Sequence, residues 1–302
     1  MATTYSWQTG SRRPFATSTP LRALRFSTPV ARVAGRVAAR SWALGVGGVI
    51  LVLAHARTAA AYRPFDGTDA DTAELGEFEL ELGPVHYYRQ GSQNFLIAPA
   101  LVLNFGIFEN TELVIDANNY VALGGLLPGT SRDSFLGDDV LVKHTFREGA
   151  LQGKTGVSIA AEGGVLTPEI NGVTNVGASL DVITSYRWGC GTLHWNEWFE
   201  FTRDHHADLF TGVIAEGPHE WTVRPVAELF YDQDFTGPST ESLLLGAIWH
   251  VRDAFDLDVG VRGARVGEVG PTGAVAQVNA LEVRLGLTWA ITMWKPKAEA
   301  HE

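Results

Sequence analysis

Residues 76–83 decide the fold, because apolar and acidic side chains alternate through them without a break: GEFELELG. Successive side chains of a β-strand point to opposite faces of the sheet. Phe78, Leu80 and Leu82 therefore lie on one face, and the three glutamates between and before them lie on the other. The stretch predicts a strand with one apolar face and one charged face.

The same alternation recurs along most of the chain after Glu74. It is clear in Glu112–Tyr120, Thr222–Tyr231 and Leu281–Met293, and clusters of Gly, Pro, Asp and Asn separate the alternating stretches. These turn signals divide the chain into twelve strands of an all-β protein, with the weakest pattern in the eighth. The predicted strands cover 75–88, 93–106, 111–121, 136–146, 153–164, 176–188, 192–202, 206–215, 219–231, 241–251, 255–266 and 278–293.

The predicted connections alternate in length. Short ones fall near Phe108–Asn110, Arg147–Gln152, Gly189–Gly191, Gly217–Pro218 and Arg252–Ala254, and longer ones near Gly124–Phe135, Thr167–Asn175, Asp232–Thr240 and Gly267–Gln277. Outer-membrane barrels have an even number of antiparallel strands, with short turns at one end and longer loops at the other. We therefore expect a single up-and-down transmembrane β-barrel over residues 75–294.

Alternation alone does not separate this barrel from a soluble one that buries its apolar face. Strand length favours the membrane version, because a tilted transmembrane strand needs about 9–11 residues. Aromatic residues near strand ends, such as Tyr120, Trp188 and Trp294, fit the aromatic girdles of membrane proteins. Packing of aromatics across a soluble sheet remains the alternative.

The last predicted strand reads Arg284-x-Gly286-x-x-Trp289-x-Ile291. It resembles the C-terminal insertion signal of bacterial outer-membrane proteins, which implies recognition by the barrel-assembly machinery. A polar tail, 295–302, follows it.

The first 61 residues differ in charge from the rest. They hold eight of the 23 basic residues and none of the 34 acidic ones. Arginines precede a 13-residue apolar run, Trp42–Ala54, and Ala59–Ala61 offers a cleavage site for a signal peptide. We expect 1–61 to be an N-terminal extension and signal peptide, removed near Ala61, and 62–74 to be a periplasmic segment. Residues 1–29 also fit a transit peptide or a start site placed too far upstream.

Composition argues against several classes of protein and partner. One cysteine excludes a disulfide framework, and a net charge of −11 argues against nucleic acid as a partner. Nothing in the sequence indicates a cofactor.

Several short stretches resemble outer-membrane proteins named for the meta-pathway of phenol degradation. They are 63–69 (RPFDGTD), 76–81, 137–143, 224–229 and 260–265. The resemblance spans roughly 62–294 and implies a barrel in the outer membrane, in contact with its lipid, that acts as a transporter or channel.

If the apolar faces meet lipid, the charged side chains of the strands line the lumen. The candidate lumen-lining residues are Glu79, Glu81, Asp116, Lys143, Glu162, Arg187, Arg224, Glu228, Arg262, Glu282 and Arg284. They predict passive or facilitated passage of small solutes, hydrophobic or aromatic molecules among them. The alternative is a narrow barrel filled by ion pairs, with a structural or adhesive role.

Two other chemistries were weighed. His205, His206 and Asp208 could ligate a metal, but polar residues of this kind are common in exposed loops, so no metal site is predicted. Outer-membrane phospholipases use Ser and His, yet their His-x-Ser-Asn-Gly motif is absent here, and Ser158, Ser179 and Ser185 have no nearby His partner in sequence. The prediction is a protein that is not an enzyme, with an esterase as the remote alternative.

Overall fold

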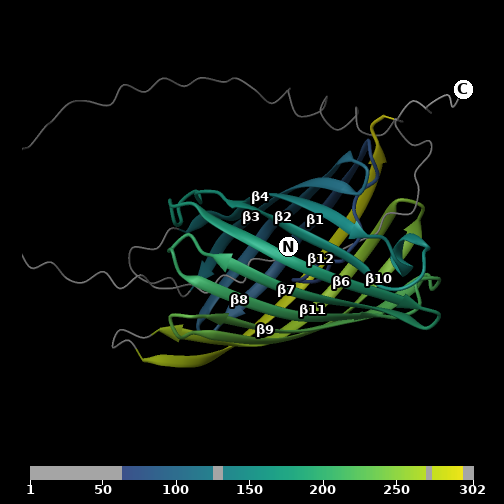
Figure 1. Cartoon of the computed structure of the whole chain (residues 1–302). Helices are drawn as coiled ribbons and strands as arrows, with labels where there is room; N and C mark the ends of the chain where they lie inside the picture. The colour runs from purple at the N-terminus through teal and green to yellow at the C-terminus, as the bar shows by residue number, and fades with distance from the viewer. Residues whose placement is uncertain (1–62, 125–131, 270–273, 295–302) are drawn as a thin grey trace, which may run out of the picture. The chain divides into compact units, whose positions relative to one another are not determined.

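The computed structural model describes residues 63–124, 132–269 and 274–294, which form one closed barrel (Figure 1). Every strand pairs antiparallel with its neighbours in sequence, and β1 pairs with β12 to close the wall. The strands are β1 (Glu77–Gln90), β2 (Gln93–Phe108), β3 (Thr111–Gly124), β4 (Asp133–Arg147), β5 (Ser158–Leu166), β6 (Gly177–Trp188), β7 (Gly191–Phe201), β8 (Ala207–Glu216), β9 (Val223–Asp234), β10 (Ser239–Arg252), β11 (Phe255–Val269) and β12 (Val275–Thr292). The predicted all-β barrel of twelve strands is confirmed.

The predicted strand boundaries are wrong mainly at the starts of β5 and β9. The structure begins β5 at Ser158 rather than 153, because the chain first forms a short 3-10 helix, Ala150–Gln152. Gly153 and Gly156 follow it with positive φ angles of 71° and 89°, which a strand does not adopt. Before β9, the amide of Trp221 bonds the carbonyl of Pro218 in a turn, so pairing starts only at Val223.

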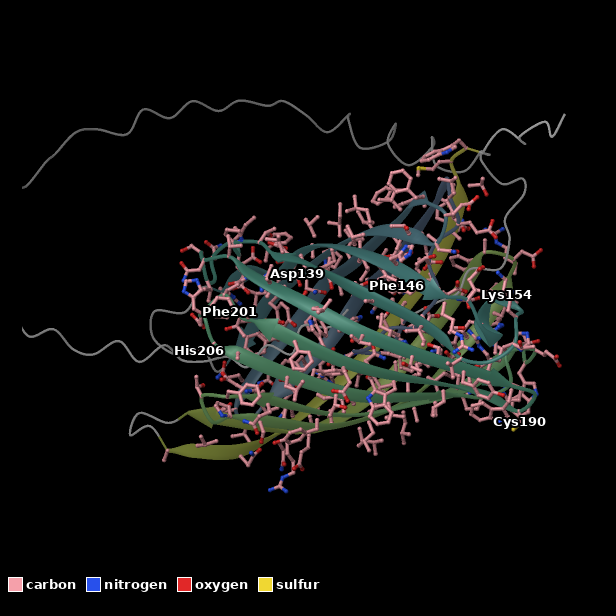
Figure 2. The ribbon with its side chains drawn as sticks, in the orientation of Figure 1. Asp139, Phe146, Lys154, Cys190, Phe201 and His206 are labelled. Atoms are coloured by element: carbon pink, nitrogen blue, oxygen red, sulfur yellow. The ribbon has the colours of Figure 1, made fainter. Side chains whose placement is uncertain are left out.

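Connections of different length separate the two ends of the barrel. We call the end that carries the connections at 109–110, 189–190 and 253–254 the turn end, and the opposite end, with the connections at 167–176 and 202–206, the loop end. Figure 2 shows Lys154 and Cys190 near the turn end and Phe201 and His206 near the loop end. The β4–β5 connection at the turn end is longer than predicted, because it contains the 3-10 helix.

The apolar face of the wall points outward. On β9, the outward Leu229 is 62% exposed whereas the preceding Glu228 is 1% exposed. Exposed Leu245, Trp249 and Val261 continue the apolar exterior on β10 and β11. A soluble barrel of this size would reverse the pattern, since exposed apolar area in water is unfavourable. The exterior therefore suits lipid.

Glu197 on β7 is an exception to this apolar exterior. Its neighbours Asn196 and Trp198 are buried inside, so Glu197 shares the outer face with Trp195. The indole N–H of Trp195 and the hydroxyl of Thr211 both donate to its carboxylate, each over 2.7 Å. These bonds compensate part of the cost of a polar group at the lipid face.

The described part of the segment that was predicted to be periplasmic lies inside the barrel. Residues 63–73 run through the barrel interior, where Asp66 is 1% exposed and Ala70 is fully buried. Their backbone is bonded by side chains from β3, β4, β6, β7 and β9. The predicted signal peptide and the polar tail 295–302 lie outside the described residues. No helix in the described ranges is long and apolar enough to cross a membrane.

Candidate functional site: the barrel interior

Residues 63–73, hereafter the interior segment, occupy the barrel interior through their own backbone. The amides of Asp66 and Gly67 donate to the carboxylate of Glu228 on β9, over 2.9 Å and 2.7 Å. A buried backbone amide needs a partner, and the segment cannot take it from the backbone of the wall, which is already paired. An inward-facing carboxylate supplies that partner here.

A second set of wall side chains binds the middle of the interior segment. The amide of Thr68 donates to Asn196 Oδ1, and Asn196 Nδ2 donates back to the carbonyl of Thr68, each over 2.8 Å. The amide of Ala70 donates to Ser185 Oγ over 3.0 Å, while Thr145 Oγ1 donates to the Ala70 carbonyl over 2.9 Å. These side chains hydrogen-bond to the backbone of the segment, as the backbone of a neighbouring strand would.

Charged groups fix the start of the interior segment. Arg284 donates to Asp66 Oδ1 over 2.8 Å and to the carbonyl of Pro64 over 2.7 Å. Arg262 lies 3.3 Å from the same Asp66 carboxylate and 2.5 Å from Glu282. The two arginines and two carboxylates form a buried network that balances their charges, as buried ions require.

Arg63, at the start of the segment, contacts two further residues of the wall. Its guanidinium donates to His86 Nε2 over 2.5 Å and lies 3.7 Å from the carboxylate of Asp258. Burial lowers the pKa of Arg63, and the carboxylate of Asp258 opposes that shift.

The end of the interior segment meets Lys143 on β4. The ammonium lies 3.4 Å from Asp69 and 3.4 Å from Glu112, and the amide of Ala73 donates to Glu112 over 2.5 Å. Burial, followed by the neighbouring carboxylate of Asp69, raises the pKa of Asp71. Lys143 is thus the cation that joins the segment to the acidic wall of β3.

Glycines in the wall make room for the segment. A Cβ at Gly260 would lie 3.1 Å from Pro64, and one at Gly286 would lie 2.4 Å from Arg63 Nε. At Gly106 on β2 a Cβ would lie 1.9 Å from the carbonyl oxygen of Glu74, where the segment turns into β1. Side chains at Gly260 and Gly286 would meet side-chain atoms of Pro64 and Arg63, and one at Gly106 would meet the backbone of Glu74.

Gly106→Ala is therefore expected to destabilise the barrel by roughly 1–3 kcal/mol, the usual cost of overpacking. The added methyl group would overlap the backbone of Glu74 rather than a flexible side chain, so the backbone that joins the segment to β1 must shift. Urea unfolding in detergent, followed by tryptophan fluorescence, measures the change. Gly263→Ala is the matched control, because a Cβ there meets nothing within 4 Å. Equal stability of the two variants would contradict the close approach of Glu74 to Gly106.

The predicted lumen-lining residues separate into two sets. Five of them contact the interior segment or the network around Asp66: Lys143, Glu228, Arg262, Glu282 and Arg284. The other six lie apart from the segment and the network. Glu79 and Glu81 accept hydrogen bonds from Asn104, and Arg224 lies 3.4 Å from Glu216. Asp116, Glu162 and Arg187 have no contact with the segment among the described interactions. Seven are buried with an exposure of 5% or less: Glu81, Asp116, Lys143, Glu162, Glu228, Glu282 and Arg284.

Sequence reasoning missed the residues that belong to the segment itself and several of its partners. Asp66, Asp69, Asn196 and Ser185 were not among the candidates, although all are buried in the interior. Asn196 and Ser185 sit on the inward face of β7 and β6, so the alternation could have indicated them. Asp66 and Asp69 lie before the first strand, where no periodic signal exists.

The structure also brings a serine and a histidine together. Ser185 Oγ and His194 Nδ1 are 2.8 Å apart, and His194 Nε2 lies 3.1 Å from Glu216 Oε1. A hydroxyl, an imidazole and a carboxylate in a row resemble a hydrolytic triad. Ser185 is fully buried, however, and its oxygen already accepts the amide of Ala70. In this structure Ser185, supported by His194 and Glu216, therefore helps to hold the interior segment.

Comparison with known proteins extends to the fold alone. No family model and no curated protein matches the sequence. An outer-membrane channel from Pseudomonas putida F1 is similar in structure, with a TM-score of 0.50, 10% identity, and coverage of 76% of this chain and 99% of that chain. The KdgM porin (TM-score 0.43, 11% identity, 70% and 98% covered) and an anion-selective porin from Comamonas acidovorans (TM-score 0.39, 8% identity, 71% and 98% covered) are more distant.

Proposed function

We propose that this protein is an outer-membrane channel that lets small solutes cross by passive or facilitated diffusion. On this proposal a signal peptide cleaved near Ala61 directs export, and the strand from Arg284 to Ile291 is recognised during insertion by the barrel-assembly machinery. The observation that carries the proposal is the pairing of an apolar exterior with a charged interior, as in Leu229 and Glu228. Charges turned away from lipid in a closed wall are the arrangement by which channels select solutes.

The interior segment limits the route that solutes can take. Its neutral hydrogen bonds each contribute about 0.5–1.5 kcal/mol, and the buried ion pairs of Asp66 add to them. Solutes consequently pass beside the segment rather than in its place.

The proposal is tested with the full-length barrel in planar bilayers and in liposomes. Discrete conductance steps, and uptake of an aromatic alcohol or a sugar of similar size into liposomes, are expected. Comparing those two solutes also tests whether hydrophobic or aromatic molecules are preferred. Liposomes without protein and with heat-denatured protein are the controls. Neither conductance nor flux of any solute would end the channel proposal.

A structural barrel without transport is the second candidate, and the filled interior favours it. Besides the segment, Trp198, Phe210 and Phe230 pack together inside the wall, as do Tyr88 and Phe95 near the loop end. If these groups close the interior completely, the bilayer experiment gives no current although the barrel is folded. A far-ultraviolet β-sheet spectrum of the same sample distinguishes that result from a failure to fold.

Ser185→Ala is expected to leave ester hydrolysis unchanged. Ser185 is fully buried beneath the interior segment and accepts a backbone amide, so no ester can reach its oxygen. Release of p-nitrophenol from a short-chain ester measures the rate for the full-length protein and the variant. A clearly faster rate for the unmodified protein would revive the esterase alternative.

A further inference from the structure

Inward-facing carboxylates sit directly opposite one another on three successive hairpins of the wall. Asp116 faces Asp139 across β3 and β4, and Glu162 faces Asp181 across β5 and β6. Glu200 faces Asp208 across β7 and β8. We call these the three carboxylate pairs. Like charges in directly opposite positions destabilise a sheet, because their Cβ atoms are only about 4.5–5.5 Å apart.

The carboxylate pairs have few partners that would offset this repulsion, the salt bridge between Arg203 and Asp139 being one. Five of the six carboxylates have one buried oxygen without a hydrogen-bond partner within the described ranges: Asp116, Asp139, Glu162, Asp181 and Asp208. The hydroxyl oxygen of Ser179, the residue opposite Glu200, is also buried and unpartnered within those ranges. Buried polar atoms normally have a hydrogen-bond partner, so these unpartnered oxygens indicate a species bound between the paired carboxylates.

The described basic groups of this side, Lys143, Arg187 and Arg203, are fewer than the six carboxylates of the pairs. Arg203, at the loop end, donates to Asp139 Oδ1 over 2.6 Å and lies 3.9 Å from Glu169. Lys143 stands opposite Glu162 in the sheet, but its ammonium lies 3.4 Å from Asp69 and from Glu112. Of the other inward arginines, Arg187 lies near the turn end of β6 and Arg224 lies 3.4 Å from Glu216, while Arg262 and Arg284 belong to the network around Asp66. The lining formed by β3–β8 therefore carries an excess of negative charge.

We propose that the three carboxylate pairs bind small cations and form a cation pathway beside the interior segment. This inference rests on the proposed channel function and names its solute class. A pair supplies two carboxylates, and the described residues contain no group of three or more His, Cys, Asp or Glu side chains placed to hold a metal ion. Binding at each pair is therefore weak, which conduction requires, because an ion must leave a site as readily as it enters. Figure 2 places Asp139 between the two ends of the barrel, as a pathway along the wall needs.

Ion selectivity tests the pathway in planar bilayers with a KCl gradient. The full-length protein should show a reversal potential of the sign given by K⁺ passage. The variant Asp116→Asn, Glu162→Gln, Asp181→Asn, Asp208→Asn should lose most of that preference. The matched control removes four exposed carboxylates, Glu109→Gln, Asp204→Asn, Glu220→Gln and Asp253→Asn, and should keep it. Current without cation preference, or a preference that survives the first variant, would overturn the inference and leave the channel intact.

Cation binding is also measurable without conduction, because Trp198 stands opposite Asp181 on the inward face. Terbium(III) bound at Asp181 should emit when tryptophan is excited. The emission should disappear in the four-carboxylate variant and fall in Trp198→Phe, while the surface control keeps it. Absence of sensitised emission from the folded full-length protein, with no cation preference, would mean that the pairs share protons instead. Emission without any current would support the site and contradict only the channel.

Discussion

Replacing residues 64–72 with an equally long Gly/Ser segment is expected to raise single-channel conductance severalfold and to lower stability. The replacement keeps the chain length and the region near Ala61, but it removes Asp66 and Asp69, on which Arg284 and Lys143 depend. A flexible segment without these contacts leaves the interior free to conduct. A twelve-stranded barrel is wider than the eight-stranded barrels that side chains alone can fill.

Two measurements separate this effect from a general loss of structure. Conductance in planar bilayers reports the passage, and retention of the folded gel mobility in unheated samples reports the barrel. A Gly/Ser replacement of loop residues 171–175, which are exposed except for the half-buried Val173, serves as the control and should leave conductance unchanged. If the interior replacement folds but conducts like the unmodified protein, the segment does not limit passage.

Arg284→Ala is expected to destabilise the barrel by about 3–5 kcal/mol, the usual cost of removing one partner from a buried ion pair. The guanidinium bonds Asp66, the carbonyl of Pro64 and Glu282, all of them buried. Its loss leaves two carboxylates to share Arg262 and leaves a backbone carbonyl without its donor. Urea unfolding in detergent micelles, followed by tryptophan fluorescence, measures the change.

Arg265→Ala is the matched control, because Arg265 lies three residues after Arg262 on β11 and is exposed. It should change stability by less than about 0.5 kcal/mol, as exposed substitutions usually do. Adding Asp66→Asn to Arg284→Ala should recover part of the loss, since the double variant no longer buries that unpaired charge. Additive losses in the double variant would show that the two residues act independently.

Local alternation was enough to predict the wall. The pattern of residues 76–83 recurs in every strand, and even the weak eighth strand forms, as β8 (Ala207–Glu216). A period of two specifies both a strand and its two faces, and the exposure of the apolar side chains then shows which face is the exterior. The late start of β5 was not predictable in the same way. The glycines before it adopt positive φ angles in the structure, and the sequence pattern alone does not show that conformation.

The list of charged interior residues was incomplete for a different reason. Strand periodicity assigns a face to Glu228, Arg262 and Arg284, but it gives no information on what those side chains contact. Their partner is Asp66, which lies 162 or more residues away in the chain and in no strand. These three side chains, expected to face a solute, contact the interior segment instead.

The sequence by itself determined twelve strands, each with one apolar and one polar face, because alternation is a local property of each strand. Only the tertiary structure decided that residues 63–73 enter the barrel, and that the carboxylates of β3–β8 oppose one another in pairs. Both depend on register and closure, which bring together residues that no local pattern connects. The physical reason is that a side chain's face is set by its neighbours in sequence, whereas its partner is set by the whole barrel.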